Sequence, residues 1–313
     1  MSRVEALIQA SLHTDVALLE ATNKRLREHP GKMLRPMLAL LAAGAVGTRT
    51  EDSCRFAAAV ELLHNATLLH DDVVDGAAQR RGLPTVFSLM GGGPAVLVGD
   101  YWLVACLKQI LQADGHVREV LDLFSQTLGH LTEGELLQLD RSGNGATTQE
   151  DYLRIVYGKT ASLFELSALS AGLSVDAPEE QVRLLGRFAR SLGTAFQIKD
   201  DIFDYSDPSV ALGKPVGIDL KEQKITQPLL CALETASPEE QQRIRSLVAK
   251  LSDEPEHIPE IQAFVKKADG VEKAAAVMEQ YILEAVESLS SLPPSREKDA
   301  LCALAAFVGK REN

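Results

Sequence analysis

Apolar residues recur every three or four positions along most of this chain, a spacing that places them on one face of an α-helix. Near the N-terminus the pattern runs through Val4, Leu7, Ile8, Leu12, Val16 and Leu19. The same period continues through residues 56–75, 95–111, 117–139, 152–173, 182–205, 229–251 and 271–292. No segment shows the alternation of a half-buried strand, so the pattern predicts an all-α fold.

Chain-breaking residues stand between these periodic segments. They are His29-Pro30-Gly31, Gly91-Gly92-Gly93-Pro94, Ser142-Gly143-Asn144-Gly145, Asp207-Pro208 and Pro293-Pro294. Residues 95–111 are apolar almost all round, which is typical of an inner helix of a large bundle. Because no stretch has the composition of an interdomain linker, we expect residues 1–313 to form a single all-α domain.

Composition narrows the class of protein. The chain has a net charge of −12 and a pI of about 5.1, which argues against nucleic acid as a partner. Its four cysteines lack the paired spacing of a zinc site or a disulfide framework. Residues 1–5 are charged where a signal peptide needs an apolar core, and the apolar run 37–46 is too short to span a bilayer. We therefore expect a soluble, cytoplasmic protein without a transmembrane segment.

An acidic pattern, Asp-Asp-x-x-Asp, occurs twice. The first copy is Asp71-Asp72-Val73-Val74-Asp75, and the second is Asp200-Asp201-Ile202-Phe203-Asp204. On a helix the first and last acids share a face, and two carboxylates that close repel by about 4 kcal/mol at an effective dielectric of 20. Apolar residues flank both copies, so these acids need cationic partners. Hard oxygen ligands suit Mg²⁺ that also binds substrate phosphates, and we expect the two helices to face each other.

Basic residues accompany both copies. Arg80-Arg81 follow the first copy, and Lys32 and Arg35 stand three apart at the start of a predicted helix. Arginine is suited to bidentate phosphate binding. The weakly periodic residues 207–227, which hold Lys214 and Lys224, follow the second copy, and we expect them to form a mobile lid.

In this order the motifs resemble the trans-type isoprenyl diphosphate synthases over essentially the whole chain. They are Gly-Lys-x-x-Arg-Pro (31–36), Glu-x-x-His (61–64), the two acidic motifs with Leu68-Leu69-His70 and Phe196-Gln197-Ile198-Lys199 before them, Arg-Arg-Gly (80–82), Val98-Gly99-Asp100-Tyr101, Gly134-Glu135, Gly-Lys-Thr (158–160) and Gly-Lys-Pro (213–215). The resemblance is greatest to medium- and long-chain members. It implies the isoprenoid synthase fold, a helical bundle around a central active-site cavity, and a homodimer with residues 95–111 as a plausible contact surface.

The resemblance also implies a role for each matching residue. Asp71, Asp75 and Asp200 bind Mg²⁺, about three ions per active site, and Asp72, Asp201 and Asp204 support them. Arg80, Lys159, Lys214 and Lys224 bind the allylic diphosphate. Lys32, Arg35, His64 and Arg81 bind isopentenyl diphosphate, and Thr160 and Gln197 lie near the developing allylic cation. The implied reaction is repeated head-to-tail 1′-4 condensation through metal-assisted ionisation, with released diphosphate as the base.

Two residues depart from the family pattern. Pro30 stands where the family usually has a glycine, and Gln223 stands before Lys224 where the family commonly has another. Neither change removes a ligand, although either could alter loop closure.

The residues expected to control product length are Ala66 and Thr67, one helical turn before Asp71. Small residues there leave the product channel open, so we expect a product longer than farnesyl diphosphate. The pattern leaves open which of Leu62, Leu63, Trp102 and Cys106 forms the floor of the product channel. A shorter farnesyl or geranylgeranyl product remains the alternative.

Three other functions fit part of the pattern. A class I terpene cyclase shares the ionisation step but needs no second diphosphate site. A non-catalytic subunit of a heteromeric synthase typically lacks some of the six acids, all of which are present here. A di-iron bundle needs two Glu-x-x-His motifs, and the only other one, Glu254 to His257, contains Pro255 in an expected loop.

Overall fold

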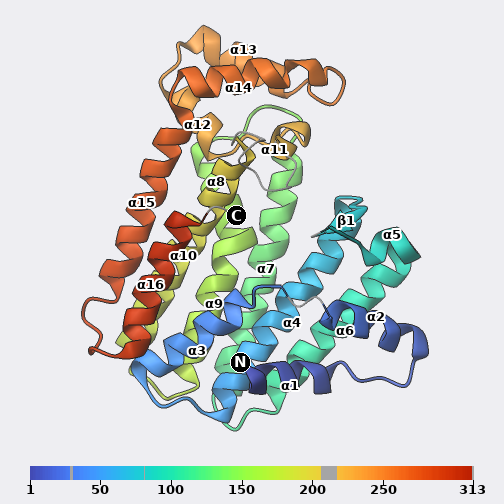
Figure 1. The fold of residues 1–313 in the computed structure, drawn as a ribbon, viewed down its shortest axis with the longest axis vertical. Coiled ribbons are helices and arrows are strands. Elements are labelled where there is room, and N and C mark those ends of the chain that lie inside the picture. The colour runs from blue at the N-terminus through green and yellow to red at the C-terminus, as the bar shows by residue number, and fades with distance from the viewer. Residues whose placement is uncertain (29–30, 81, 206–216, 312–313) are drawn as a thin grey trace. The chain divides into compact units, whose positions relative to one another are not determined.

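The computed structural model of the chain describes residues 1–28, 31–80, 82–205 and 217–311. Its regular structure is almost entirely helical (Figure 1), which confirms the all-α prediction. Within the described residues, the β-structure is one hairpin in which β1 (Gln79–Arg80) pairs antiparallel with β2 (Leu83–Pro84).

The chain divides into two compact units. Unit 1 comprises Met1–Ser125, Leu166–Leu185 and Leu292–Leu301, and unit 2 comprises the remaining segments, Gln126–Glu165, Gly186–Ser291 and Cys302–Asn313. Four helices have residues in both: α7 (Val117–Arg141), α9 (Ser162–Leu173), α10 (Glu179–Asp204) and α16 (Arg296–Lys310). That residues 1–313 form one domain stays a prediction, as does the expectation that the two acidic helices face each other.

Unit 1 is organised around α4 (Glu51–Val74). It packs most extensively against α6 (Gly92–Leu111), and also against α3 (Leu34–Val46), α1 (Ser2–Ser11) and α5 (Val86–Met90). A further helix, α2 (Ala17–Arg27), follows α1. The N-terminal half of α4 is completely buried at Phe56, Ala57, Ala58, Ala59, Val60 and Leu62. This buried half anchors the helix, and its last turn carries the first acidic motif.

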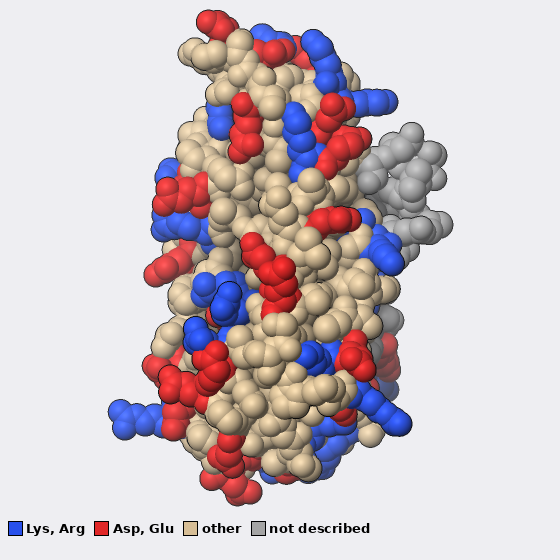
Figure 2. All heavy atoms as spheres, turned by 90° about the vertical axis from the view of Figure 1, so that its left-hand side faces the viewer, with Lys and Arg blue, Asp and Glu red and all other residues tan. Residues whose placement is uncertain are grey.

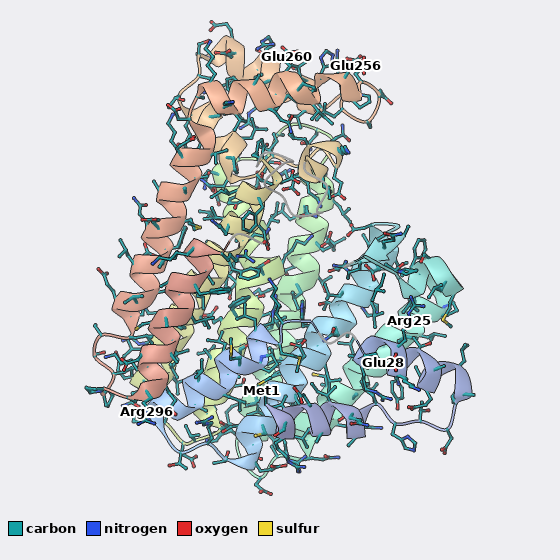
Figure 3. The ribbon with its side chains drawn as sticks, in the orientation of Figure 1. Met1, Arg25, Glu28, Glu256, Glu260 and Arg296 are labelled. Atoms are coloured by element: carbon teal, nitrogen blue, oxygen red, sulfur yellow. The ribbon has the colours of Figure 1, made fainter. Side chains whose placement is uncertain are left out.

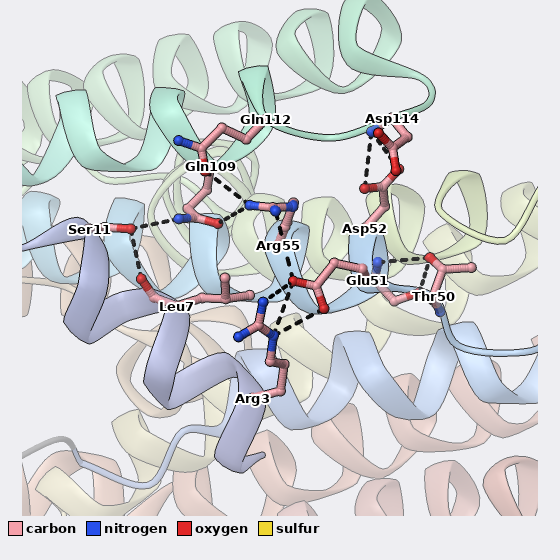
Figure 4. A network of polar contacts seen from close by, with 11 residues as sticks. Arg3, Leu7, Ser11, Thr50, Glu51, Asp52, Arg55, Gln109, Gln112 and Asp114 are labelled. Atoms are coloured by element: carbon pink, nitrogen blue, oxygen red, sulfur yellow. Dashed lines mark hydrogen bonds and ion pairs between the residues drawn. The ribbon is translucent and has the colours of Figure 1, made fainter.

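Polar contacts fix the N-terminal end of α4 (Figure 4). Arg3 of α1 donates to both carboxylate oxygens of Glu51, with Nε at 3.1 Å from each. Asp52 accepts the backbone N–H groups of Asp114 and Gly115, which follow α6. Acidic residues in a first helical turn are also favoured by the helix dipole. These contacts hold α4 to the segments on either side of it in unit 1.

Unit 2 contains the rest of the described helices. They are α8 (Gln149–Val156), the π-helix η1 (Tyr157–Ala161), α11 (Ile218–Lys221), α12 (Gln227–Glu234), α13 (Pro238–Val248), the 3₁₀ turn η2 (Pro255–His257), α14 (Ile258–Lys267) and α15 (Gly270–Ser288). The buried helix α12 packs against α15, and α14 also contacts both of them. Acidic and basic side chains are interspersed over the face of the molecule in Figure 2.

Several predicted segments are interrupted in the structure. The segment 152–173 is divided by the π-helix η1, in which Gly158 packs closely on Gly134. The segment 229–251 breaks before Pro238, whose ring ends one helix while Ser237 caps the next. The N-terminal pattern is divided between α1 and α2 at residues 12–16. The helical pattern predicted no separate element for α5, α11, α14 or α16.

The apolar segment 95–111 lies within α6, which is the one helix of the described residues with the length and composition to cross a membrane. In this structure 44% of its most apolar window is buried. All four cysteines are free thiols in the structure.

Candidate active site

The first acidic motif occupies the C-terminal end of α4. Asp71 and Asp72 lie in the last turn, and Asp75 caps the helix, its backbone N–H donating to the carbonyl of Asp71 at 2.8 Å. Asp71 is half-buried and Asp75 is exposed. Because a helix C-terminus carries a partial negative charge, three carboxylates there create a strongly negative region. Such a region attracts cations.

Asp72 differs from its neighbours because it is buried and paired. Its Oδ1 accepts a hydrogen bond from Nε of Arg80 at 2.7 Å, and its side chain is only 7% exposed. The β1–β2 hairpin holds Arg80 in place. Asp72 and Arg80 line a cavity of about 100 Å³ together with Arg25 of α2 (Figure 3). Arg81 lies outside the described residues.

His70, next to Asp71, packs against a glycine of α6. A Cβ on Gly99 would lie 2.3 Å from Nε2 of His70, which is impossible without movement. The same nitrogen lies 3.4 Å from Oδ1 of Asp100. The Val-Gly-Asp motif of the sequence therefore has a structural function, since Gly99 makes room for the residue that precedes the first acid.

The predicted isopentenyl diphosphate residues also lie in unit 1. Nη1 of Arg35 and Nε2 of His64 are 3.0 Å apart, so α3 and α4 bring these two side chains together. Lys32 is exposed just before α3, whose opening turn contains Pro36 as predicted.

The candidate chain-length residues precede Asp71 on α4. Ala66 is fully buried, and Thr67 is half-buried with its hydroxyl donating to the carbonyl of His64 at 2.9 Å. The candidate floor residues Leu62, Leu63, Trp102 and Cys106 are all buried. Trp102 also lines a cavity of about 540 Å³ with Glu61, Asn65 and residues near α2 that include Glu28 (Figure 3).

The second acidic motif occupies the C-terminal end of α10, in unit 2. Asp200 accepts a hydrogen bond from Arg311 at 2.8 Å and is 39% exposed. Asp204 accepts the backbone N–H groups of Ile218 and Asp219 at 2.9 and 3.0 Å, and so joins α10 to the start of α11. The chain thus uses Asp204 to position the backbone that follows residues 206–216.

Asp201 is the most buried acid of this copy and ends a hydrogen-bonded chain. Thr160 donates to Gln197 at 2.8 Å, Gln197 donates to Oδ1 of Asp201 at 2.9 Å, and the Tyr152 hydroxyl donates to Oδ2 at 2.5 Å. Burial raises the pKa of Asp201 to about 6, despite these two donors, which lower it. Burial and the nearby Asp201 carboxylate raise the pKa of Tyr152 well above its ordinary value.

Lys159 and Thr160 project from the π-helix η1. A Cβ on Gly158 would lie 2.6 Å from the carbonyl of His130, so this helix lies very close to α7. Nζ of Lys159 forms an ion pair with Oε2 of Glu135 at 2.5 Å. Single π-turns often occur at functional sites, and here one turns two predicted site residues toward a cavity and α10.

A cavity of about 200 Å³ connects these features of unit 2. Its lining includes the cations Arg141, Lys159 and Lys224, and it also includes Gln197 and Asp201. Asp219 lines the same cavity, and burial together with Asp201 and Asp204 raises its pKa well above the usual range. Three lining or neighbouring groups were not predicted from the sequence: Tyr152, Arg141 and Arg311. They come from separate segments that carry no local motif.

The predicted Lys214 and Gly-Lys-Pro motif lie outside the described residues, as do residues 207–216 of the predicted lid. Among the described residues no three His, Cys, Asp or Glu side chains gather closely enough to hold a metal ion by themselves. The histidines of the two Glu-x-x-His segments both have protein partners. His64 contacts Arg35, and His257 pairs with Glu254 and Glu260. The Glu-x-x-His segment at 254–257 is a 3₁₀ turn where a loop was predicted.

Comparison with known proteins identifies the family. The family model described as polyprenyl synthetase matches residues 16–265. The octaprenyl diphosphate synthase of Escherichia coli is 36% identical over 312 residues, covering 100% of this chain and 96% of that protein. The crystal structure of a decaprenyl diphosphate synthase from Rhodobacter capsulatus is 36% identical with a TM-score of 0.92, covering 100% of this chain and 96% of that one.

A third relative is a polyprenyl synthase from Caulobacter crescentus, solved in complex with calcium and isoprenyl diphosphate. It is 31% identical, with a TM-score of 0.91 and coverage of 100% of this chain and 95% of that one. These three relatives cover 100% of this chain, and the segment matched by the family model includes both acidic motifs. The chain belongs to the polyprenyl synthetase family.

Proposed function

We propose that this protein is a trans-polyprenyl diphosphate synthase that adds isopentenyl diphosphate repeatedly, head to tail, to an allylic diphosphate. The observation that carries the proposal is the cavity of unit 2, where Lys159 and Lys224 lie beside Asp201 and the Thr160–Gln197 pair. Fixed cations, a buried carboxylate and a polar hydrogen-bonded chain are what diphosphate ionisation requires.

The six acids of the two motifs have different surroundings. Asp72, Asp201 and Asp204 are held by Arg80, by Tyr152 and Gln197, and by backbone N–H groups, respectively. We assign Mg²⁺ binding to Asp71, Asp75 and Asp200, of which Asp75 is exposed and Asp200 is 39% exposed, because hard carboxylate oxygens suit Mg²⁺. These carboxylates would hold Mg²⁺, which would supply positive charge to neutralise the leaving diphosphate.

The basic residues then bind the two substrates. Lys159 and Lys224 line the cavity of unit 2, where we place the allylic diphosphate. The family resemblance assigns Arg80 and Lys214 to the same diphosphate. Arg35 and His64, already 3.0 Å apart, bind isopentenyl diphosphate together with Lys32 and Arg81. Fixed positive charges stabilise the leaving group without needing to reorganise during the reaction.

The cationic intermediate needs weakly basic oxygens but no protein nucleophile. The Thr160 hydroxyl and the Gln197 side chain, held in one hydrogen-bonded chain, lie near the developing allylic cation. The alkene of isopentenyl diphosphate attacks this cation, the new C–C bond forms, and one proton is lost to the released diphosphate. Exclusion of water protects the cation during this sequence.

The product is longer than farnesyl diphosphate. The relatives described above are named for octaprenyl and decaprenyl products, and this chain has small residues at Ala66 and Thr67. A farnesyl or geranylgeranyl product remains the shorter alternative, and chromatography of the hydrolysed products distinguishes these lengths.

A diphosphate-release assay tests the reaction class. We expect release only when farnesyl diphosphate, isopentenyl diphosphate and Mg²⁺ are all present. Release from farnesyl diphosphate alone would identify a terpene cyclase. No release under any condition would favour a non-catalytic subunit of a heteromeric synthase.

We also propose a cytoplasmic homodimer that uses α6 as its contact surface. Leu97, Val104, Leu107 and Leu111 of this helix are exposed, which is unusual for large apolar residues on one helix. Light scattering of the wild type and of a Leu97→Glu, Leu107→Glu double variant tests this, and a monomeric wild type would contradict it.

A further inference from the structure

The turn that carries Lys224 ends α11 with an unusual residue. The N–H of Lys224 donates to the carbonyl of Asp219 at 2.8 Å, and that of Gln223 donates to the carbonyl of Leu220 at 2.9 Å. This pair of bonds defines a Schellman motif, in which the residue at the position of Gln223 adopts a left-handed conformation and is usually glycine. Gln223 has φ of +56°. Glutamine therefore stands at a position where the left-handed backbone conformation disfavours any residue other than glycine or asparagine.

The Gln223 side chain makes contacts that glycine cannot make. Its Nε2 donates to the carbonyls of Val248 and Ala249, at 3.2 and 2.9 Å. These carbonyls lie at the C-terminal end of α13, where the last carbonyls of a helix lack partners within it. One amide group thus bonds the α11 turn to the end of α13.

The C-terminal part of α13 is also hydrogen-bonded to a second segment that borders the cavity. Nη1 of Arg245 donates to the carbonyls of Gly145 and Thr147, at 2.8 and 2.9 Å. Gly143 packs against the Gln223 side chain, because a Cβ there would lie 3.3 Å from Oε1. Thr147 and Lys224 both line the cavity. Through α13, the two segments that border the cavity are therefore fixed to a common support.

We propose that Gln223 is a positioning residue that holds Lys224 at the diphosphate cavity by bonding the α11 turn to the C-terminal end of α13. The inference rests on the proposed function only in assigning diphosphate to the cavity. Gln223 contacts no reacting atom. It acts through Lys224, and its effect appears in diphosphate binding.

Three substitutions separate the side-chain bonds from the backbone conformation. Gln223→Gly adopts the left-handed turn readily and loses both bonds. Gln223→Asn tolerates the turn but is one methylene too short to reach α13. Gln223→Glu keeps the size of the side chain but places an acceptor opposite two carbonyl acceptors. Gln242→Glu, on the exposed face of α13, is the control for the change in charge.

Two measurements follow: the kinetic constants for farnesyl and isopentenyl diphosphate, and calorimetric binding of inorganic diphosphate with Mg²⁺. We expect the three Gln223 variants to raise KM for farnesyl diphosphate and to weaken diphosphate binding by about fivefold, the factor for losing ordinary hydrogen bonds. We expect KM for isopentenyl diphosphate and the Gln242→Glu control to stay within about twofold of the wild type. Unchanged diphosphate binding in the Gly and Glu variants would overturn the proposal.

A double-variant cycle tests whether the effect passes through Lys224. In a Lys224→Ala background, we expect Gln223→Gly to add less than a twofold change to diphosphate binding. A full fivefold change there would show that Gln223 acts otherwise and would also overturn the proposal. If the wild type binds diphosphate but condenses nothing, the proposed function fails while this cycle still decides the role of Gln223. If the wild type does not bind diphosphate at all, both fail.

Discussion

Nη2 of Arg311 lies 2.8 Å from Oδ1 of Asp200, so the third residue from the end of the chain is hydrogen-bonded to the second acidic motif. The same nitrogen donates to the carbonyl of Phe196 at 2.8 Å, and the guanidinium lies 3.8 Å from the centre of the Phe196 ring. The Arg311 side chain is only 6% exposed. Arg311, the residue directly after α16, therefore places a buried cation against α10 in unit 2.

We expect Arg311→Ala to lower the free energy of unfolding by about 1–3 kcal/mol, because it removes donors from a carboxylate and a carbonyl and the packing on Phe196. Urea denaturation measures this change. The matched control is Lys310→Ala on the exposed side of α16, for which we expect a change within about 0.5 kcal/mol. Equal stability of the two variants would show that the Arg311 contacts do not hold this end of the chain.

A second stability prediction concerns Gly99 of α6, where any side chain would meet His70. A Cβ there would lie 2.3 Å from the His70 ring, so we expect Gly99→Ala to destabilise the protein by about 1–3 kcal/mol through overpacking. Gly93→Ala is the control, since nothing lies within 4 Å of a Cβ on that residue of the same helix. Thermal unfolding should show a loss only for Gly99→Ala. Adding His70→Ala should recover part of it, and additive effects would contradict the clash.

The sequence predicted the fold class and the placement of both acidic motifs because each rests on local information. Helical period and the Asp-Asp-x-x-Asp spacing are visible in a short window, and both motifs do lie at helix ends. The apolar residues beside the acids predicted burial less reliably. Ile198 and Ile202 are buried, but Val74 is 52% exposed. Apolar flanks report burial of a helix face, and a helix end leaves part of that face in solvent.

The sequence could not predict contacts between distant segments. Tyr152 and Asp201 are 49 positions apart, and Arg311 and Asp200 are 111 apart, with no pattern that links them. The close approach of Gly134 to Gly158 in the π-helix joins residues 24 positions apart, and it is a property of packing. By contrast, the departure at Gln223 was visible in the sequence, although its reason, two bonds to the end of α13, required the structure.

Tyr152→Phe should destabilise the protein because Asp201 loses one of its donors in a buried site. We expect a decrease of about 1–3 kcal/mol in the free energy of unfolding, measured by urea denaturation. The control is Tyr101→Phe, whose hydroxyl donates to the carbonyl of His13 in an exposed place where water can replace it. A similar, small effect in both variants would mean that the buried bond contributes little.

His116 gives a pH-dependent prediction. It lies 2.8 Å from Asp176 and 3.6 Å from Glu119, and the hydrogen bond to Asp176 is the main cause that raises its pKa above the ordinary 6.5. A raised histidine pKa stabilises the folded state fully below the unfolded pKa, and this contribution is lost as pH rises through the folded pKa. Because Asp176 is exposed, we expect only about 0.5 kcal/mol.

The test compares the wild type with His116→Asn, which tolerates the left-handed backbone at this position. The variant should be less stable than the wild type at about pH 5.5, and the difference should shrink at about pH 8.5, above the raised pKa. Asp176→Asn should reduce the pH dependence in the same way. A difference that grows toward high pH would reverse the sign and contradict the ion pair.

Thr67→Phe should shorten the product. Thr67 is half-buried one helical turn before Asp71, so a phenyl ring has room to project from α4, whereas Ala66 is fully buried and a ring there would overpack the core. Thr67→Val is the matched control, because it keeps the size of the side chain and removes only the hydroxyl bond to the carbonyl of His64. Chromatography of the hydrolysed products should show shorter chains for Thr67→Phe and the wild-type length for Thr67→Val. If both variants keep the wild-type product, Thr67 does not line the path of the growing chain, and the length is set at a deeper position on α4 or α6.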